Sequence, residues 1–229
     1  MVKHIHYFKT EADFNEARTN NYLEPWVSYT VEGESVAFNK LPITYNAVDL
    51  GLPSGTLWCD RNIGASSPEE YGDYYAWGEI APNKATYTSQ NYRFYSNSKY
   101  NSTDGKETLD PEDDAAHVVM GGEWHIPSDT QLKELINNTT TAWTTDYNGT
   151  GKVGMIVTSK INTNSIFFPA AGISADGTSD PGIRFSIWSS ARRRFEDYAA
   201  STLIGNSSGM EYYSDEDRWR GLSVRGVIG

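Results

Sequence analysis

The sequence has little cysteine and no long apolar run. Cys59 is the only cysteine, which excludes an intramolecular disulfide and a zinc site built from several thiolates. The amino-terminal residues lack the apolar core of a signal peptide. No stretch approaches the roughly 18 apolar residues that a membrane helix needs, so we expect no membrane insertion.

Basic residues are also scarce. The 229 residues include 19 Lys and Arg against 30 Asp and Glu, giving a formal net charge of −11. Proteins that bind nucleic acid generally carry a basic footprint, so we expect no nucleic-acid partner. Aromatic residues are abundant, with 15 Tyr and 7 Trp, and such side chains serve cores and binding surfaces alike.

Residues 1–46 are expected to form a small N-terminal α/β-hairpin module. The pattern predicts a strand at 4–8, a helix at 10–18 capped by Thr10, and a hairpin of 26–31 with 35–38. A unit this small needs support from a neighbour, so a homo-oligomer formed through this module is one expectation.

Residues 47–229 combine many short strands with two helices, which predicts an α+β domain. One helix is expected from the N-cap Asp110, with Pro111 at its first position, to about Met120. The other begins at the N-cap Ser128, with Gln131 completing a capping box. Residues 87–106 are aperiodic and are interpreted as a long surface loop. Strands are expected at 153–159, 165–168, 185–190, 199–204, 209–213 and 221–227.

Candidate catalytic and metal-binding patterns are weak. The four histidines form no visible ligand cluster, and Ser189-Ser190 lacks a nucleophile-elbow pattern. The acidic run 110–114 is better explained as a charge arrangement at a helix start than as a calcium loop. Asp215-Glu216-Asp217 is interpreted as a solvated turn in preference to a weak calcium site. We therefore expect no enzyme activity, no cofactor and no metal.

Several motifs occur in an order that resembles one family. These are Val48-Asp-Leu-Gly-Leu-Pro-Ser-Gly-Thr-Leu-Trp58, Glu70-Tyr-Gly-Asp-Tyr-Tyr-Ala-Trp-Gly-Glu79, Gly121-Gly-Glu-Trp-His-Ile-Pro127, Asn164-Ser-Ile-Phe-Phe-Pro-Ala-Ala-Gly172, Ile187-Trp-Ser-Ser190 and Gly221-Leu-Ser-Val-Arg225. Residues 47–229 resemble the Fibrobacter succinogenes major paralogous domain, common in gut Bacteroidetes and their phages. That domain is similar to the C-type-lectin-like folds of formylglycine-generating enzymes and of the variable proteins of diversity-generating retroelements.

The resemblance implies a C-type-lectin-like fold with two helices and short antiparallel sheets. It does not carry over the family's chemistries, because a single cysteine cannot supply the formylglycine-generating site and the calcium-dependent lectin tripeptides are missing. The recurring Trp58, Trp77, Trp124 and Trp188 are interpreted as core residues, and Gly51, Gly55, Gly64, Gly72 and Gly78 as turn residues.

The resemblance also places a ligand-binding face in the C-terminal stretch. Residues 192–198 and 210–220 are rich in Arg, Tyr and Trp, the side chains that dominate binding hot spots. The alternative is an ordinary exposed loop with incidental charge pairing. Only one of sixteen asparagines, Asn206, lies beyond Asn164, a depletion that adenine replacement by a retroelement would leave.

By position, the candidate diversified, ligand-contacting residues are Arg184, Ser186, Ile187, Arg192, Arg193, Arg194, Phe195, Glu196, Asp197, Glu211, Tyr213, Asp215, Glu216, Asp217, Trp219 and Arg220. Trp188, Gly221, Val224 and Arg225 are expected to be invariant framework.

The expected function is therefore non-catalytic binding of a protein or carbohydrate ligand on a cell surface by a hypervariable face. A phage tail or a cell surface is the expected location, with receptor binding as one role. Two alternatives stay open: an invariant Bacteroidetes surface domain that binds glycan or matrix, and a degenerate formylglycine-type oxidase.

Overall fold

The chain divides into two compact units, residues 1–44 and 45–229. The computed structural model describes residues 5–8, 28–31, 34–36, 43–82, 84–95, 98–176, 178–194 and 196–229. Its secondary structure is mixed α+β, with helices and mostly antiparallel sheets, as predicted.

The described part of the first unit is a three-stranded sheet. Strand β1 (Ile5–Phe8) pairs in parallel with β2 (Ser28–Val31), and β2 pairs antiparallel with β3 (Glu34–Val36). The expected hairpin is confirmed. The helix predicted at 10–18 lies outside the described residues.

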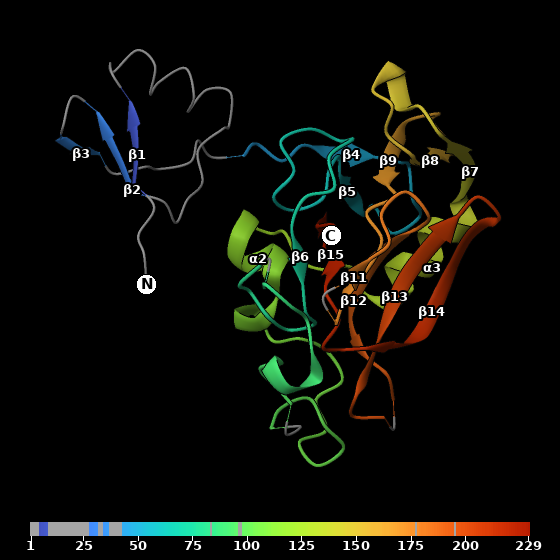
Figure 1. The fold of residues 1–229 in the computed structure, drawn as a ribbon. Coiled ribbons are helices and arrows are strands. Elements are labelled where there is room, and N and C mark those ends of the chain that lie inside the picture. Colours follow the sequence, from blue (N-terminus) through green and yellow to red (C-terminus); the bar gives the residue numbers. More distant parts are fainter. Residues whose placement is uncertain are drawn as a thin grey trace. The chain divides into compact units, whose positions relative to one another are not determined.

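The largest sheet of the second unit has five strands, and its strands β12 and β14 carry eight of the sixteen candidate binding residues; Figure 1 shows the two strands in this sheet. Its order is β14 (Gly209–Asp217), β13 (Ala199–Asn206), β12 (Phe185–Arg192), β15 (Leu222–Ser223) and β6 (Tyr74–Tyr75). All neighbours are antiparallel except β12 and β15. The predicted strands at 185–190, 199–204 and 209–213 are confirmed, and each continues further than predicted.

Smaller sheets complete the unit. One has the order β16 (Val227–Ile228), β5 (Leu57–Cys59) and β4 (Ala47–Asp49), and so brings the two ends of the unit together. A second contains β7 (Thr139–Thr144), β8 (Gly154–Ser159) and β9 (Ser165–Pro169). The third pairs β10 (Ser174–Ala175) with β11 (Thr178–Ser179).

The helix α3 (Asp129–Asn138) follows from local sequence. The Ser128 side chain accepts a hydrogen bond from the Gln131 backbone N–H, and the Gln131 side chain accepts one from Ser128, so the predicted capping box is confirmed. The helix packs against β12, β13 and β14.

The first predicted helix begins later than expected. Residues Pro111–Asp113 form a single 3-10 turn, and Asp110 makes no side-chain cap bond. The helix α2 (Ala115–Met120) is capped instead by Asp114, whose carboxylate accepts from the His117 N–H at 3.0 Å. Consecutive acids offer several capping positions, and Asp114 is fixed because it also accepts from the Ile126 N–H. Two further 3-10 turns lie at Ser89–Asn91 and Tyr147–Gly149.

Two apolar clusters form the core of the unit. Trp77 and Trp188 belong to one cluster, and Trp58 and Ile187 belong to the other. Neighbouring residues of β12 thus contribute to different clusters, because successive side chains of a strand point to opposite faces. Three of the four predicted core tryptophans are fully buried, whereas Trp124 is only half-buried.

The interpretation of residues 87–106 as a surface loop is wrong for four of its five aromatic side chains, with Tyr95 as the exposed one. The described part of the segment has little regular structure, yet Tyr87, Tyr92, Phe94 and Tyr100 are buried. Their apolar surface joins the cluster of Trp77 and Trp188. Tyrosines in a Ser- and Asn-rich stretch carry no periodicity, so local sequence did not indicate their burial.

The predicted turn glycines adopt the left-handed conformation, with positive φ at Gly51, Gly55, Gly64, Gly72 and Gly78. Gly72 shows why no other residue fits. At φ 71°, an added Cβ would lie 2.4 Å from the carbonyl oxygen of Ile63.

Arg225 anchors the framework from inside. It is fully buried, and its guanidinium donates to Asn62 Oδ1 at 2.9 Å, to the Cys59 carbonyl at 3.0 Å and to the Phe167 carbonyl at 2.8 Å. Burial lowers the pKa of Arg225 to about 10. The side chain thereby ties the C-terminal segment to β5 and β9.

Replacing Arg225 by Ala should lower the free energy of unfolding by about 3 kcal/mol or more, because two buried carbonyls lose a donor and a cavity remains. The matched control is Arg194→Ala, whose side chain is 72% exposed and should cost no more than about 0.5 kcal/mol. Urea denaturation measures both. Equal losses in the free energy of unfolding would contradict the assignment of Arg225 to the framework and of Arg194 to the surface.

Candidate ligand-binding surface

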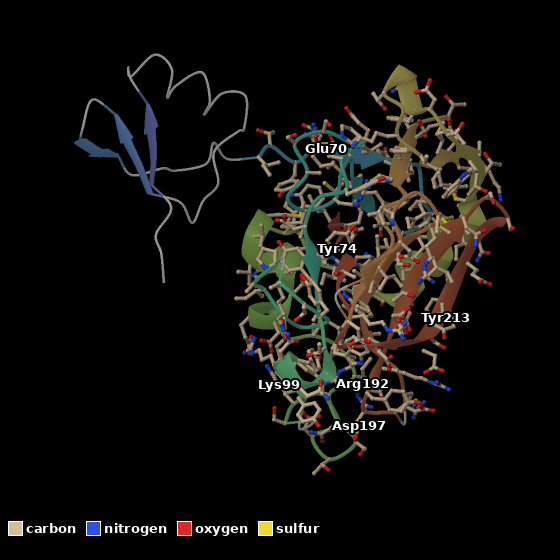
Figure 2. All side chains as sticks on the ribbon, in the orientation of Figure 1. Glu70, Tyr74, Lys99, Arg192, Asp197 and Tyr213 are labelled. Atoms are coloured by element: carbon tan, nitrogen blue, oxygen red, sulfur yellow. The ribbon has the colours of Figure 1, made fainter. Side chains whose placement is uncertain are left out.

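The alternation of strand β14 explains which of its side chains are accessible. Glu211, Tyr213 and Asp215 are exposed, whereas the residues between them, Tyr212 and Ser214, are half-buried. This period of two is the pattern of an edge strand with one face on the domain. Three of the candidate residues therefore lie on one outer face, with Tyr213 at the edge of the sheet in Figure 2.

The connection between β12 and β13, residues 193–198, carries four of the other eight accessible candidates. Pairing of β12 with β13 changes register between Trp188 and Arg192, and pairing of β13 with β14 changes between Ala200 and Thr202. Such bulges redirect side chains at the end of a sheet. Arg192 and Asp197 lie together at this end, near Lys99 (Figure 2).

Eleven of the sixteen predicted residues are at least partly accessible. They are Arg184, Arg193, Arg194, Glu196, Asp197, Glu211, Tyr213, Asp215, Asp217, Trp219 and Arg220. Phe195 lies outside the described residues. The structure brings together those between 193 and 197 and between 213 and 220. Arg184 precedes β12, at the opposite end of that strand from Arg193, and its positive charge acts on Glu216.

Four predicted contact residues are buried, which corrects the sequence interpretation. Ser186 and Ile187 are at most 1% exposed, and Ile187 packs in the apolar cluster that contains Trp58. Arg192 is 6% exposed and donates to the Lys106 carbonyl at 2.8 Å. Glu216 is 5% exposed, and burial raises its pKa. These side chains belong to the framework in this conformation.

The accessible arginines form ion pairs with neighbouring acids. Arg193 pairs with Asp215 and, at 3.3 Å, with Glu196. Arg220 pairs with Glu216 at 2.9 Å and with Asp217 at 3.1 Å. The charge pairing expected of an ordinary exposed loop, the alternative to a binding surface, is therefore present. Such pairs contribute little stability near water, but they hold the guanidinium groups in place.

Beside this surface lies an open pocket of about 460 Å³, which we call the arginine pocket. Its lining residues are Glu107, Thr108, Asp129, Ala191, Arg192, Arg193, Arg194, Ser201, Tyr212 and Ser214.

The wall of the arginine pocket contains a hydrogen-bonded cluster centred on Asp129, the first residue of α3. Its carboxylate accepts from Ser189 Oγ at 2.6 Å, Tyr212 Oη at 2.7 Å and Ser201 Oγ at 3.3 Å. Burial and the neighbouring carboxylate raise the pKa of Tyr212 to about 12. Sequence analysis missed Asp129 because these partners come from three separate strands.

A second pocket, of about 230 Å³, we call the aromatic pocket. It is lined by Ser89, Tyr92, Phe94, Tyr95, Asp197, Tyr198, Asp217 and Trp219. Asp197 accepts from the Ser102 N–H at 2.8 Å, which ties it to the chain that follows residues 89–95. Only three of its residues were predicted. The aromatic density of 87–100 was the available signal, and it was interpreted as loop.

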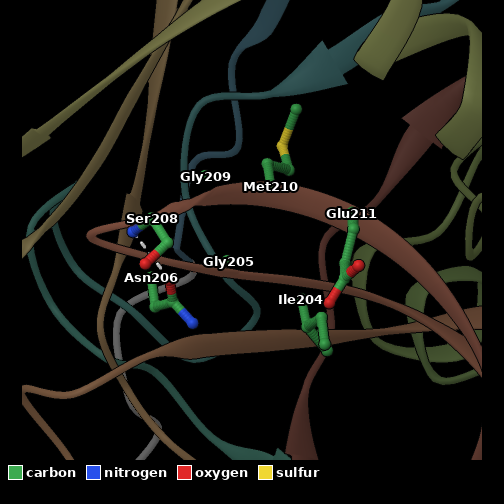
Figure 3. Close-up of a pocket in the computed structure, with 7 residues that line it drawn as sticks. All are labelled: Ile204, Gly205, Asn206, Ser208, Gly209, Met210 and Glu211. Carbon is green, nitrogen blue, oxygen red and sulfur yellow. Dashed lines mark hydrogen bonds between the residues drawn. The ribbon is translucent and has the colours of Figure 1, made fainter.

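A third concavity lies at the turn between β13 and β14 (Figure 3). It measures about 210 Å³ and is lined by Ile204, Gly205, Asn206, Ser208, Gly209, Met210 and Glu211. The Asn206 side chain accepts from the Ser208 N–H at 2.8 Å and closes the turn. Of the candidate residues, only Glu211 lines it.

Cys59 is buried, and burial raises the pKa of its thiol to about 11, so it stays protonated at neutral pH. Among these residues, Asp110, Glu112 and Asp113 form the one acidic group close enough to share a metal ion. The Lys99 ammonium nitrogen lies 2.7, 3.2 and 2.6 Å from carboxylate oxygens of Asp110, Glu112 and Asp113, respectively.

Comparison with known proteins gives no matching family model, no matching curated protein and no matching solved structure. None of the helices in the described part of the chain has the length and apolar character needed to span a membrane.

Replacing Asp129 by Asn should lower the pKa of Tyr212 from about 12 toward 10. A nearby negative charge disfavours the phenolate, and the substitution removes that charge. NMR of ¹³C-labelled tyrosine measures the pKa, with the resonance assigned by its loss in Tyr212→Phe. An unchanged pKa would mean that the two groups do not interact in solution.

Proposed function

We propose that this chain is a non-catalytic ligand-binding protein whose C-terminal segment forms a variable display surface, as in retroelement variable proteins. One observation carries the proposal. The side chains of β12 are almost all buried, whereas Glu211, Tyr213 and Asp215 of β14 and the described residues of the 193–198 connection are accessible and lie beside the arginine and aromatic pockets.

A C-type-lectin-like fold is part of the proposal. It is supported by the two helices, by the short antiparallel sheets, and by the pairing of β16 with β5 that joins the ends of the unit. The motif tryptophans Trp58, Trp77 and Trp188 are fully buried, which suits residues that hold such a framework.

Binding would rely on side chains that are ordered before the ligand arrives. Arg193 is held by two acids, and Tyr213 is 41% exposed on an edge strand. Ordered guanidinium and aromatic groups lose little conformational entropy on binding, which favours affinity. Exposed positions on a fixed sheet can also vary at a cost usually below about 0.5 kcal/mol.

The ligand classes that fit are a protein and a carbohydrate on a cell surface, displayed by a phage tail or another cell-surface structure. An invariant surface domain that binds glycan or matrix is the alternative. The oxidase alternative has no supporting observation, because the thiol of Cys59 is buried.

The gene's surroundings separate the first two. A variable protein requires a reverse-transcriptase gene and a nearby repeat that differs from codons 184–220 only where the repeat has adenine. A repeat with differences at other bases, or none at all, contradicts diversification and favours the invariant domain.

The double variant Arg194→Ala, Tyr213→Ala should lose at least about tenfold in affinity for a glycan or bacterial cell surface that the unaltered chain binds, because both removed groups are accessible anchors. Binding to glycan arrays and intact cells measures this. The melting temperature should stay nearly constant.

The matched control is Lys160→Ala, Ile161→Ala, which removes a charge and a large exposed side chain between β8 and β9. It should bind normally. Equal loss in the control, or full binding by the double variant, would contradict the assignment of the surface.

A further inference from the structure

We infer that the aromatic pocket binds a cationic group on an alkyl chain, the chemistry shared by a lysine side chain and a quaternary ammonium ion. The inference rests on the proposed ligand-binding function and specifies what one part of that surface recognises. None of the residues 89–95 that help to form this pocket belongs to the predicted binding set.

The walls of the pocket are aromatic faces and edges. Tyr92 and Phe94 are buried and pack edge to face, with ring centroids 5.7 Å apart, which fixes the inner wall. Tyr95 and Tyr198 are 58% and 55% exposed, and Trp219 is half-buried. Large exposed aromatic side chains gathered around a cavity offer π faces, and π faces attract cations.

The charged groups that line the pocket have one sign. Asp197 and Asp217 are its ionisable acids, and no basic residue occurs among the described residues that line it. The arginine pocket differs, because three arginines line it. Carboxylates beside aromatic rings favour a cation and disfavour an anion.

The two carboxylates are held in place and keep acceptor capacity. Asp197 accepts from the Ser102 N–H and Oγ and from Arg192 at 3.3 Å, and Asp217 accepts from Arg220 at 3.1 Å. A carboxylate has about four lone-pair sites, so a further N⁺–H or a close ammonium group can be accommodated. The guanidinium carbon of Arg220 lies 5.4 Å from the Trp219 ring centroid and that of Arg218 lies 5.5 Å from the Tyr92 centroid, so these two rings already have a cation beside them. The largely exposed rings of Tyr95 and Tyr198 are therefore the ones offered to a ligand.

The direct test uses NMR of the full chain with small probes. Choline and 3,3-dimethylbutan-1-ol have nearly the same shape, and only choline is charged. Choline should shift the indole N–H signal of Trp219 saturably, and the neutral alcohol should bind at least about fivefold more weakly. Nα-acetyl-lysine amide and tetramethylammonium separate a lysine side chain from a quaternary ion as the preferred form.

Two variants locate the effect. Asp217→Asn keeps the shape of the side chain and removes its charge, and should weaken choline binding several-fold. Glu70→Gln is the matched control, because Glu70 is exposed and lies at the opposite end of this unit from Asp197 (Figure 2). Tyr95→Ala should also weaken binding, and because Tyr95 is largely exposed the fold should persist.

Three results would overturn the inference. The first is a shift of the Trp219 signal by the neutral alcohol, or by the uncharged sugar methyl glucoside, as large as the shift by choline. The others are unchanged choline affinity in Asp217→Asn and a loss of choline affinity in Glu70→Gln equal to that in Asp217→Asn. These outcomes leave the proposed function separately testable. If no cation binds while Arg194→Ala, Tyr213→Ala still loses cell or glycan binding, the pocket assignment fails and ligand binding stands. If choline binds and that double variant behaves normally, the cation site stands and the display surface fails.

Discussion

The buried guanidinium of Arg218 determines how the candidate surface is built. It donates to Tyr92 Oη at 3.1 Å and to the carbonyls of Tyr100 and Lys99, and it stacks 4.9 Å from the Trp77 ring centroid. Its own carbonyl accepts from the Trp77 N–H at 2.9 Å. The segment from Tyr92 to Tyr100, whose described residues have little regular structure, is thereby fixed to the end of β14. A buried charge is costly unless it is hydrogen-bonded. The positions of the groups that accept from Arg218 are therefore strongly constrained.

The aromatic pocket follows from that constraint. Tyr92 and Phe94 form its inner wall because Arg218 and the apolar cluster hold their segment, while Asp217 and Trp219 flank Arg218 in sequence. Arg225 plays a comparable part for β5 and β9, where it donates to carbonyls of both. Arg218 and Arg225 thus join distant segments from the interior, and the accessible Arg193 and Arg220 pair with nearby acids. The same residue type serves the framework and the surface, distinguished by burial.

Local features of the fold could be predicted from the sequence, because their causes lie within a few residues. The capping box of Ser128 and Gln131 and the left-handed turn at Gly72 are of this kind. The burial of Arg192 depends on the Lys106 carbonyl, 86 residues away, and that of the Tyr100 ring on Trp77 and Asp113, which lie in other segments, so neither followed from local sequence. The candidate site divides likewise. The exposure of Tyr213 follows from strand alternation, whereas Asp215, interpreted from the sequence as part of a turn, lies in β14. The burial of Ser186 depends on segments that are distant in the sequence.

The central claim is that a fixed interior permits a variable surface in one continuous segment. Saturation mutagenesis of residues 184–220, with each variant scored for resistance to proteolysis, tests it most directly. The account predicts broad tolerance at Arg194, Glu211 and Tyr213, and intolerance at Ile187, Trp188, Arg192 and Arg218. Uniform intolerance along the segment, or tolerance at Trp188 and Arg218, would contradict it.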